Sequence, residues 1–403
     1  MEQEKVILVG VALGLVSECE ASLDELEELA ATAGAVSVGR VIQSREAFSS
    51  ATYVGKGKLE EIQTMIYATG ADTVICDDEL TPAQLRNLND RLEAKILDRT
   101  LLILDIFAGR ASSSEGKIQV ELAQLRYRAS RLAGLGTSLS RQGGGIGTRG
   151  PGEKQIEVDK RLIHGRIGTL KQELAKVEKH RMTQRGKRQN EKIPIIAIVG
   201  YTNAGKSTLL NTLTGAQIYA QDQLFATLDP TTRRYELANG QKILLTDTVG
   251  FIRKLPHHLV EAFRSTLEEA KYADVIMHVA DSSNPQVEEQ MQTVYETLQH
   301  LKITDKPVIT VFNKQDKEGA QPDLKDVRAE EVVRISAKNK EGLEALEEAI
   351  IRILQQGKVK IDRVIPFAQA SLLARIRQEG QLELEEYTEE GIHVVAYVPE
   401  SFY

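Results

Sequence analysis

PIIAIVGYTNAGKSTLLNTLTG, residues 194–215, is the stretch that decides the fold class of this chain. Its apolar opening predicts a short buried strand. The strand leads into G-x-x-x-x-G-K-[ST], with Gly200, Gly205, Lys206 and Ser207 at the fixed positions. Glycines here let backbone N–H groups surround phosphates at a helix N-terminus, where the helix dipole favours negative charge. Strand, loop and helix in this order predict a phosphate-binding loop rather than a chance glycine turn.

Side chains of this loop and of a second strand predict a Mg²⁺ site. Lys206 supplies a cation for the β- and γ-phosphates, and the Ser207 hydroxyl is a ligand for Mg²⁺. The second strand, KILLTDTVGF (242–251), ends in Asp-Thr-Val-Gly. We expect Asp247 to hold the same ion, usually through water. Gly250 has no side chain, so we expect its backbone N–H to approach the γ-phosphate.

A third and a fourth motif predict which base is bound. PVITVFNKQD (307–316) is a strand that leads to Asp316, and a carboxylate there can accept both hydrogen bonds from guanine N1 and N2. We expect it to be buried, so that adenine, which cannot offer these donors, would leave it unmatched. VVRISAK (332–338) supplies the backbone of Ser336 and Ala337 for the guanine O6. Four motifs in order, each at a strand end, predict a P-loop GTPase with GTP as substrate and Mg²⁺ as cofactor.

The group that positions the attacking water is not evident. In Ras-like GTPases a glutamine shortly after the equivalent of Gly250 orients this water, whereas Phe251 follows it here. Since phenylalanine cannot orient water, we expect slow intrinsic hydrolysis. A partner, an ordered switch loop or Asp229 supplies the group, or Phe251 only packs and the backbone places the water. The residues leave these alternatives open.

Charge is unevenly distributed along the chain. The 403 residues carry a net charge of −7, yet residues 106–192 contain 19 Lys and Arg against 8 Asp and Glu. A basic middle in an acidic protein favours a polyanionic partner. The alternative is a solvated, Lys- and Arg-rich helix surface.

Cysteines and hydropathy indicate the compartment. The chain has two cysteines, Cys19 and Cys76, without metal-ligand spacing, so we expect a reducing compartment and no disulfide framework. The first residues lack a basic start and a long apolar run, and no apolar stretch approaches the ~20 residues that span a bilayer. We expect a soluble, cytoplasmic, monomeric protein with no membrane anchor.

Four parts follow from the patterns along the chain, and together they predict an α/β fold class. Residues 1–112 alternate strands and helices, which predicts a small α/β domain with a mainly parallel sheet. Residues 113–190 carry apolar residues at spacings of three and four, which predicts an antiparallel helical hairpin, with a glycine-rich loop at 134–152 and a basic hinge at 182–192. Residues 191–356 form the GTPase domain, a mixed sheet flanked by helices, and residues 357–403 form a small β-α-β-β module.

The chain resembles the HflX family of bacterial GTPases that act on the large ribosomal subunit. The GTPase domain carries its pattern as GYTNAGKS, LFATLDPTTR, DTVGF and NKQD. The resemblance extends over roughly residues 1–355, through YVGKGKLEEI, DDELTPAQLRNL, DRTLLILDIFAGRA, ELAQLRYR and GGGIGTRGPGE. It is less specific from residue 358 onward.

The resemblance implies a partner and several roles. Members bind the large subunit and its RNA, and they promote splitting or rescue of stalled ribosomes under stress in a GTP-dependent way. By the family pattern Thr227, rather than Thr231 or Thr232, closes over Mg²⁺, and a hydrophobic residue after DTVG is a family trait. The guanine contacts are implied at Asn313, Lys314 and Asp316. No DNA is expected as a partner.

The complete predicted site has three groups of residues. The catalytic residues are Lys206, Thr227 and Gly250, and the metal ligands are Ser207, Thr227 and Asp247. The nucleotide-binding residues are Gly200, Tyr201, Thr202, Asn203, Ala204, Gly205, Lys206, Ser207, Phe225, Ala226, Thr227, Leu228, Asp229, Asp247, Thr248, Val249, Gly250, Asn313, Lys314, Gln315, Asp316, Ser336, Ala337 and Lys338.

Two other functions compete with a ribosome-associated GTPase. One is a nucleotide-gated module that binds RNA or protein, in which turnover is incidental. The other is an RNA-modifying GTPase, but no cofactor motif or reactive cysteine constellation supports it.

Overall fold

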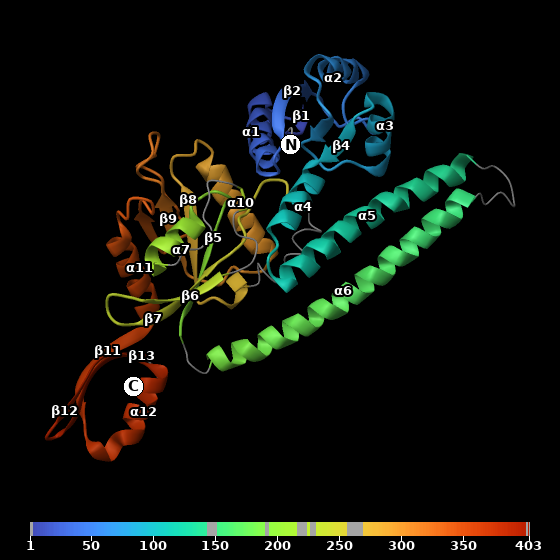
Figure 1. Cartoon of the computed structure of the whole chain (residues 1–403). Coiled ribbons are helices and arrows are strands. Elements are labelled where there is room, and N and C mark those ends of the chain that lie inside the picture. The colour runs from blue at the N-terminus through green and yellow to red at the C-terminus, as the bar shows by residue number, and fades with distance from the viewer. Residues whose placement is uncertain are drawn as a thin grey trace. The chain divides into compact units, whose positions relative to one another are not determined.

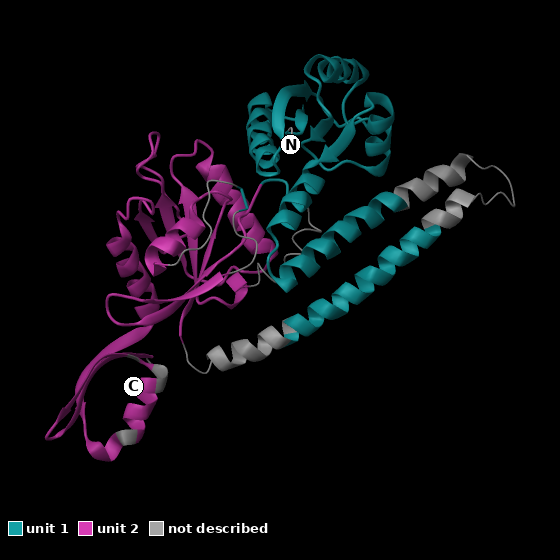
Figure 2. Ribbon diagram, viewed as in Figure 1, with its two compact units in different colours: residues 1–179, 222–229, 253–264 teal, residues 180–221, 230–252, 265–403 magenta. Residues whose placement is uncertain are grey.

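The computed structural model of the chain describes residues 3–142, 151–189, 193–215, 224–225, 231–255, 269–399 and 402 (Figure 1). By its internal contacts the chain forms two units (Figure 2). Unit 1 comprises residues 1–179, 222–229 and 253–264, and unit 2 comprises residues 180–221, 230–252 and 265–403. Among the described residues, no helix has both the length and the apolar composition needed to cross a membrane.

Unit 1 begins with a four-stranded parallel sheet in the order β2-β1-β3-β4. The central strand KVILVGVA is buried along nearly its whole length, as is typical of parallel strands covered on both faces. Thr81 begins the helix after β3 with a capping box, in which its hydroxyl and the Gln84 side chain each bond the other's backbone N–H. The predicted parallel α/β fold is confirmed. Its elements are β1 (Lys5–Ala12), α1 (Val16–Thr32), β2 (Val36–Ser44), α2 (Lys56–Thr69), β3 (Thr73–Cys76), α3 (Pro82–Leu92), β4 (Lys95–Asp98) and α4 (Arg99–Arg110).

Two long helices, α5 (Ser114–Gln142) and α6 (Pro151–Gln189), form the predicted hairpin (Figure 1). Leu122 of α5 packs with Ile167 and Leu170 of α6 at the centre of an apolar seam. The same cluster includes Ile118, Leu125, Ile163 and Leu174. The apolar residues spaced by three and four positions in the sequence are therefore the ones that pack between the two helices.

The hairpin differs from the prediction in two places, the start of the glycine-rich loop and the basic hinge. Helix α5 continues through Gly134 and Gly136 to Gln142, so the glycine-rich loop does not begin at residue 134. A glycine costs a helix about 1 kcal/mol relative to alanine, which a long helix tolerates. Helix α6 likewise runs through most of the expected basic hinge to Gln189, because lysine, arginine and glutamine are good helix formers.

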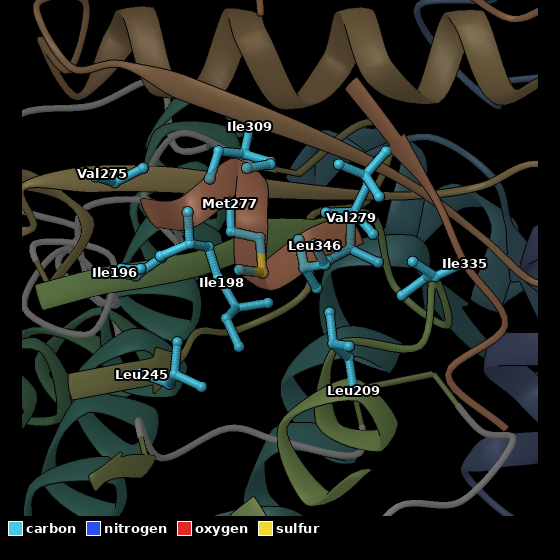
Figure 3. Close-up of a cluster of buried hydrophobic side chains, with 14 of the residues drawn as sticks. Ile196, Ile198, Leu209, Leu245, Val275, Met277, Val279, Ile309, Ile335 and Leu346 are labelled. Atoms are coloured by element: carbon cyan, nitrogen blue, oxygen red, sulfur yellow. The ribbon is translucent and has the colours of Figure 1, made fainter. Parts of the chain in front are cut away.

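Unit 2 contains a six-stranded mixed sheet in the order β10-β9-β8-β5-β7-β6, in which only β6 is antiparallel to its neighbour. Its core gathers side chains of β5, β7, β8 and β9 against α7 and α11 (Figure 3). In a parallel sheet the carboxyl ends of β5, β7 and β9 meet at one edge, where the predicted motifs lie. The elements are β5 (Ile195–Gly200), α7 (Lys206–Thr214), β6 (Thr231–Glu236), β7 (Lys242–Asp247), β8 (Val275–Asp281), α10 (Val287–His300), β9 (Val308–Asn313), β10 (Glu331–Arg334) and α11 (Leu343–Gln355).

A separate three-stranded antiparallel sheet, β11-β13-β12, follows at the C-terminal end of unit 2. Val394, Ala396 and Val398 alternate along β13 and are fully buried with Leu373 and Ile376 of α12. This is the β-α-β-β order expected from the sequence. The elements are β11 (Lys358–Ile365), η1 (Phe367–Gln369), α12 (Ala370–Glu379), β12 (Gln381–Thr388) and β13 (Gly391–Pro399).

Candidate nucleotide-binding site

The loop between β5 and α7 requires glycine at its end. Gly205 has φ of +94°, which residues with a side chain rarely adopt, and it precedes the first residue of α7. A Cβ at Gly205 would lie 2.2 Å from Nδ2 of Asn313. The asparagine of the base motif therefore lies directly against the phosphate loop.

Lys206 lies inside this loop as a buried cation. Its Nζ donates hydrogen bonds to the carbonyl oxygens of Gly200, at 3.1 Å, and Tyr201, at 2.7 Å. Burial lowers the pKa of Lys206 to about 8, although the carboxylate of Asp247 opposes this effect. The ammonium is thus held at the start of a helix, where an anion would meet both the charge and the helix dipole.

Ser207 and Asp247 lie together, as two ligands of one Mg²⁺ should. The Ser207 hydroxyl donates to Oδ2 of Asp247 at 2.7 Å, and Asp247 is fully buried at the end of β7. The Thr202 hydroxyl of the same loop is buried without a hydrogen-bond partner among the described residues. A hydroxyl and a carboxylate are hard oxygen donors of the kind that Mg²⁺ prefers, and this ion usually takes its other ligands from phosphate and water. The residues present therefore fit Mg²⁺.

Gly250 approaches the phosphate loop more closely than any other residue type would allow. A Cβ there would lie 2.9 Å from Cα of Thr202 and 3.0 Å from Nζ of Lys206. The next residue pairs with the same loop, because Phe251 N–H donates to the Gly200 carbonyl at 3.1 Å and its carbonyl accepts from Thr202 N–H at 2.8 Å. The backbone at Gly250 is therefore set against the place where phosphates are expected.

Phe251 is a packing residue. Its side chain is 1% exposed, so the ring takes part in the core and has no access to water. Of the alternatives that the sequence left open, this observation favours a Phe251 that packs. The position of the attacking water must then be set by other groups.

Asn313 joins two loops of the site. Its Nδ2 donates to the Ala204 carbonyl at 2.9 Å, and its Oδ1 accepts from Ala337 N–H at 3.0 Å. The expected base-contacting asparagine thus connects the phosphate loop to the loop after β10. Lys314, in a left-handed conformation at φ of +64°, pairs with Asp281 at 2.8 Å.

Asp316 differs from expectation in its burial. It is exposed rather than buried, because it lies in the turn beyond the end of β9. The Ser336 hydroxyl donates to its Oδ1 at 2.6 Å and lowers the pKa of the Asp316 carboxyl. The carboxylate therefore stays ionised and is oriented by Ser336, and a guanine base itself would have to exclude water from it.

Most predicted site residues meet at this one edge of unit 2. Phe225 groups with unit 1, where the centroid of its ring lies 4.6 Å from that of Phe107. Ala226, Thr227, Leu228 and Asp229 lie outside the described residues. The residues that gather at the edge are Gly200 to Ser207, Asp247 to Gly250, Asn313 to Asp316 and Ser336 to Lys338.

Sequence reasoning missed two residues of the site. Asp281, at the end of β8, is the ion-pair partner of Lys314. Ser282 is fully buried, and its hydroxyl donates to the Asn313 carbonyl and accepts from Nε2 of Gln315. The sequence contains a pattern that could have identified both residues, because the polar run Asp-Ser-Ser directly follows an apolar strand. The other motifs of the site were recognised by the same pattern.

Comparison with known proteins identifies three matching families along the chain. Residues 20–108 match the family described as GTP-binding GTPase N-terminal, and residues 110–188 match GTP-binding GTPase Middle Region. Residues 195–314 match the family described as 50S ribosome-binding GTPase.

Two relatives that align with nearly the whole chain are both GTPases named HflX. A GTPase HflX from Lacrimispora saccharolytica is 60% identical and covers 100% of this chain and 95% of its own length. The GTPase HflX of Escherichia coli is 42% identical, over 96% of this chain and 92% of its own. Among solved structures, a GTP-binding protein from the archaeon Sulfolobus solfataricus in complex with GDP is 27% identical over 87% of this chain and 99% of its own, with a TM-score of 0.45.

Proposed function

Because this chain belongs to the HflX family of GTPases, we propose that it couples its hydrolysis of GTP to association with the large ribosomal subunit. The observation that carries this proposal is the match of residues 195–314, which include the phosphate loop and Asp247, to a family described as a 50S ribosome-binding GTPase. The excess of Lys and Arg over Asp and Glu in residues 106–192 supports an RNA partner for this part of the chain.

In the proposed reaction each group of the site has one task. Lys206 and the backbone N–H groups of residues 200–207 bind the β- and γ-phosphates. Ser207, Asp247 and Thr227 hold Mg²⁺, which neutralises charge on the phosphates when it is bound. Gly250 presents its N–H to the γ-phosphate, and Asp316 reads guanine N1 and N2.

The buried ring of Phe251 leaves the attacking water without a side chain at the position where Ras-like GTPases have glutamine. We infer that the large subunit orders the group that positions this water, so basal hydrolysis is slow and subunit-stimulated hydrolysis is faster. The physiological outcome would be splitting or rescue of stalled ribosomes under stress.

The experiment is GTP hydrolysis by the full chain alone, with purified large subunits, and with small subunits as the matched control. We expect stimulation by large subunits only. The Lys206→Ala variant should lose nucleotide binding and turnover under all three conditions. If large subunits do not change the rate of GTP hydrolysis by this chain, the proposed coupling is wrong.

The same buried Phe251 favours a second candidate, a nucleotide-gated binding module in which turnover is incidental. Co-sedimentation with large subunits in a non-hydrolysable GTP analogue separates the two. Nucleotide-dependent binding without stimulated hydrolysis would favour the module, whereas binding with stimulation favours the GTPase.

A further inference from the structure

Among the residues that the structure describes, the hydroxyl of Thr202 is the one buried hydroxyl without a hydrogen-bond partner. Thr202 is only 6% exposed, so water does not take the place of that partner. A buried hydroxyl that makes no hydrogen bond costs free energy, and native folds keep few such groups. The hydroxyl of Thr202 therefore points to a partner that the chain alone does not supply.

Other hydroxyls of the same edge find their partners within unit 2. The Ser207 hydroxyl, at the start of α7, donates to Asp247 at 2.7 Å. The Thr248 hydroxyl, directly after β7, donates to the Ile198 carbonyl at 2.8 Å. The missing partner of Thr202 is therefore not a general property of this edge of the sheet.

Contacts within unit 2 fix the place of the Thr202 side chain. A Cβ at Gly250 would lie 2.8 Å from Cγ2 of Thr202 and 3.0 Å from Nζ of Lys206. The backbone N–H of Thr202 donates to the Phe251 carbonyl at 2.8 Å, which holds the phosphate loop against the segment after β7. The methyl group and the hydroxyl of Thr202 are carried on the same Cβ. The hydroxyl therefore also lies near the Gly250 backbone and the Lys206 ammonium.

An anion bound by both Gly250 and Lys206 would lie within reach of this hydroxyl. In the proposed function, these two groups bind the γ-phosphate. A phosphate oxygen accepts hydrogen bonds, and a hydroxyl has one hydrogen to donate. A hydrogen bond to a charged acceptor is stronger than one between neutral groups, and more so where water is excluded. The γ-phosphate is therefore the partner that suits the chemistry of this hydroxyl.

We propose that the Thr202 hydroxyl donates a hydrogen bond to the γ-phosphate of GTP and so adds to the preference for GTP over GDP. The inference rests on the proposed binding of the γ-phosphate by Gly250 and Lys206. The unpartnered hydroxyl raises the free energy of the nucleotide-free chain, and the bond to the phosphate removes that cost. GDP has no γ-phosphate, so the hydroxyl should leave the affinity for GDP unchanged.

Two other roles of Thr202 would give different results. A threonine that acts only through its methyl group, packed against Gly250, has no use for the hydroxyl, and removal of the hydroxyl would change neither affinity. A hydroxyl that binds Mg²⁺ would contribute to the affinity for GDP as well as for GTP, because the ion accompanies both nucleotides. Only a bond to the γ-phosphate changes the ratio of the two affinities.

The test measures dissociation constants for GDP and for a non-hydrolysable GTP analogue, with Mg²⁺ present, on the full chain. Thr202→Val keeps the shape and the methyl group of the side chain and removes the hydroxyl. We expect the preference for the analogue over GDP to fall about tenfold, the size of one hydrogen bond to a charged group, with the affinity for GDP unchanged. Thr202→Ser keeps the hydroxyl and should retain most of the preference.

Thermal unfolding of the nucleotide-free chain gives a second measurement. Because Thr202→Val removes a buried hydroxyl without a partner, we expect it to raise the melting temperature by about 2–4 °C. Thr310→Val is the matched control, since Thr310 of β9 is fully buried and its hydroxyl donates to Oδ2 of Asp326 at 2.6 Å. This control loses a hydrogen bond, so it should lower the melting temperature and keep the wild-type ratio of affinities.

An unchanged ratio in Thr202→Val, an equal loss of both affinities, or a lower melting temperature of this variant would each overturn the inference. Lys206→Ala separates it from the proposed function on which it rests. If Lys206→Ala loses nucleotide binding and Thr202→Val keeps the wild-type ratio, the role of Thr202 is wrong and the phosphate site stands. If Lys206→Ala binds both nucleotides like wild type, the phosphate site is wrong, and the inference about Thr202 falls with it. Neither result depends on ribosomal subunits.

Discussion

At the scale of single residues, Asp316 and Ser336 show how an exposed carboxylate can still read a base. The hydroxyl of Ser336 orients the carboxylate and keeps it ionised. Asp316→Asn replaces an acceptor by an amide, which suits the oxo group of xanthine better than the amino group of guanine. We expect the preference for GTP over xanthosine triphosphate to fall by about ten- to a hundredfold, since hydrogen bonds to charged groups contribute about 1.5–3 kcal/mol. Competition binding with both nucleotides checks this, and an unchanged preference would refute base reading by Asp316.

The burial of His278 in β8 has a measurable consequence for the stability of the fold. It is fully buried and its ring meets that of Tyr295 edge-on at 5.1 Å, and burial lowers the pKa of His278 to about 4. The folded chain therefore keeps His278 neutral, while the unfolded chain protonates it near pH 6.5. The stability that this difference contributes is complete above pH 6.5 and is lost as the pH falls toward 4.

Denaturant unfolding at pH 7.5 and pH 5 tests this effect. We expect His278 to account for about 2 kcal/mol of the loss in unfolding free energy between the two values, from its shifted pKa. His278→Gln should lose that part of the pH dependence, whatever its stability at pH 7.5. His164→Gln, an exposed histidine of α6, is the control and should keep the wild-type slope. An equal slope in His278→Gln and wild type would contradict a neutral buried His278.

At the scale of elements, local patterns predicted the strands and their motifs, but not where the helices of the hairpin end. Each motif follows an apolar run that must form a buried strand, so the order of the strands placed the motifs at one edge. Glycines at 134 and 136 suggested a loop, yet the preceding turns of α5 carried the helix through them. The contact between Lys254 and Asp77 joins residues 177 positions apart, and no local pattern indicates such a partner.

The hairpin carries a prediction of its own. Residues 143–150, between the described ends of α5 and α6, contain Arg149, and Arg141 lies in the last turn of α5. Replacing residues 143–150 by a neutral Gly/Ser linker of equal length, together with Arg141→Ser, removes two cations and leaves the nucleotide site unchanged. We expect unchanged GTP affinity, weaker binding to large subunits and a salt dependence that is shallower by up to about two units of slope, at roughly 0.7–0.9 per phosphate.

Two measurements decide that prediction. Co-sedimentation with large subunits over a range of salt concentrations gives the slope, and nucleotide binding in the same buffers gives the control. If the variant binds the subunit like wild type, the segment is only a linker. The RNA partner must then be sought at other basic positions of residues 106–192.

At the scale of the whole molecule, a switch protein must obey reciprocal coupling between its two ligands. If GTP strengthens binding to the large subunit by some factor, the subunit strengthens GTP binding by the same factor, because both report one coupling free energy. We expect a factor of about 5–150, the usual range of allosteric coupling, with a non-hydrolysable analogue and a smaller factor with GDP. The measurement is the subunit affinity with and without analogue, and the analogue affinity with and without subunits.

Because both factors report one coupling free energy, unequal factors in the two directions would show that binding was not at equilibrium. A wild-type factor of one, by contrast, would mean that the subunit does not sense the nucleotide, and the switch function would have to be abandoned.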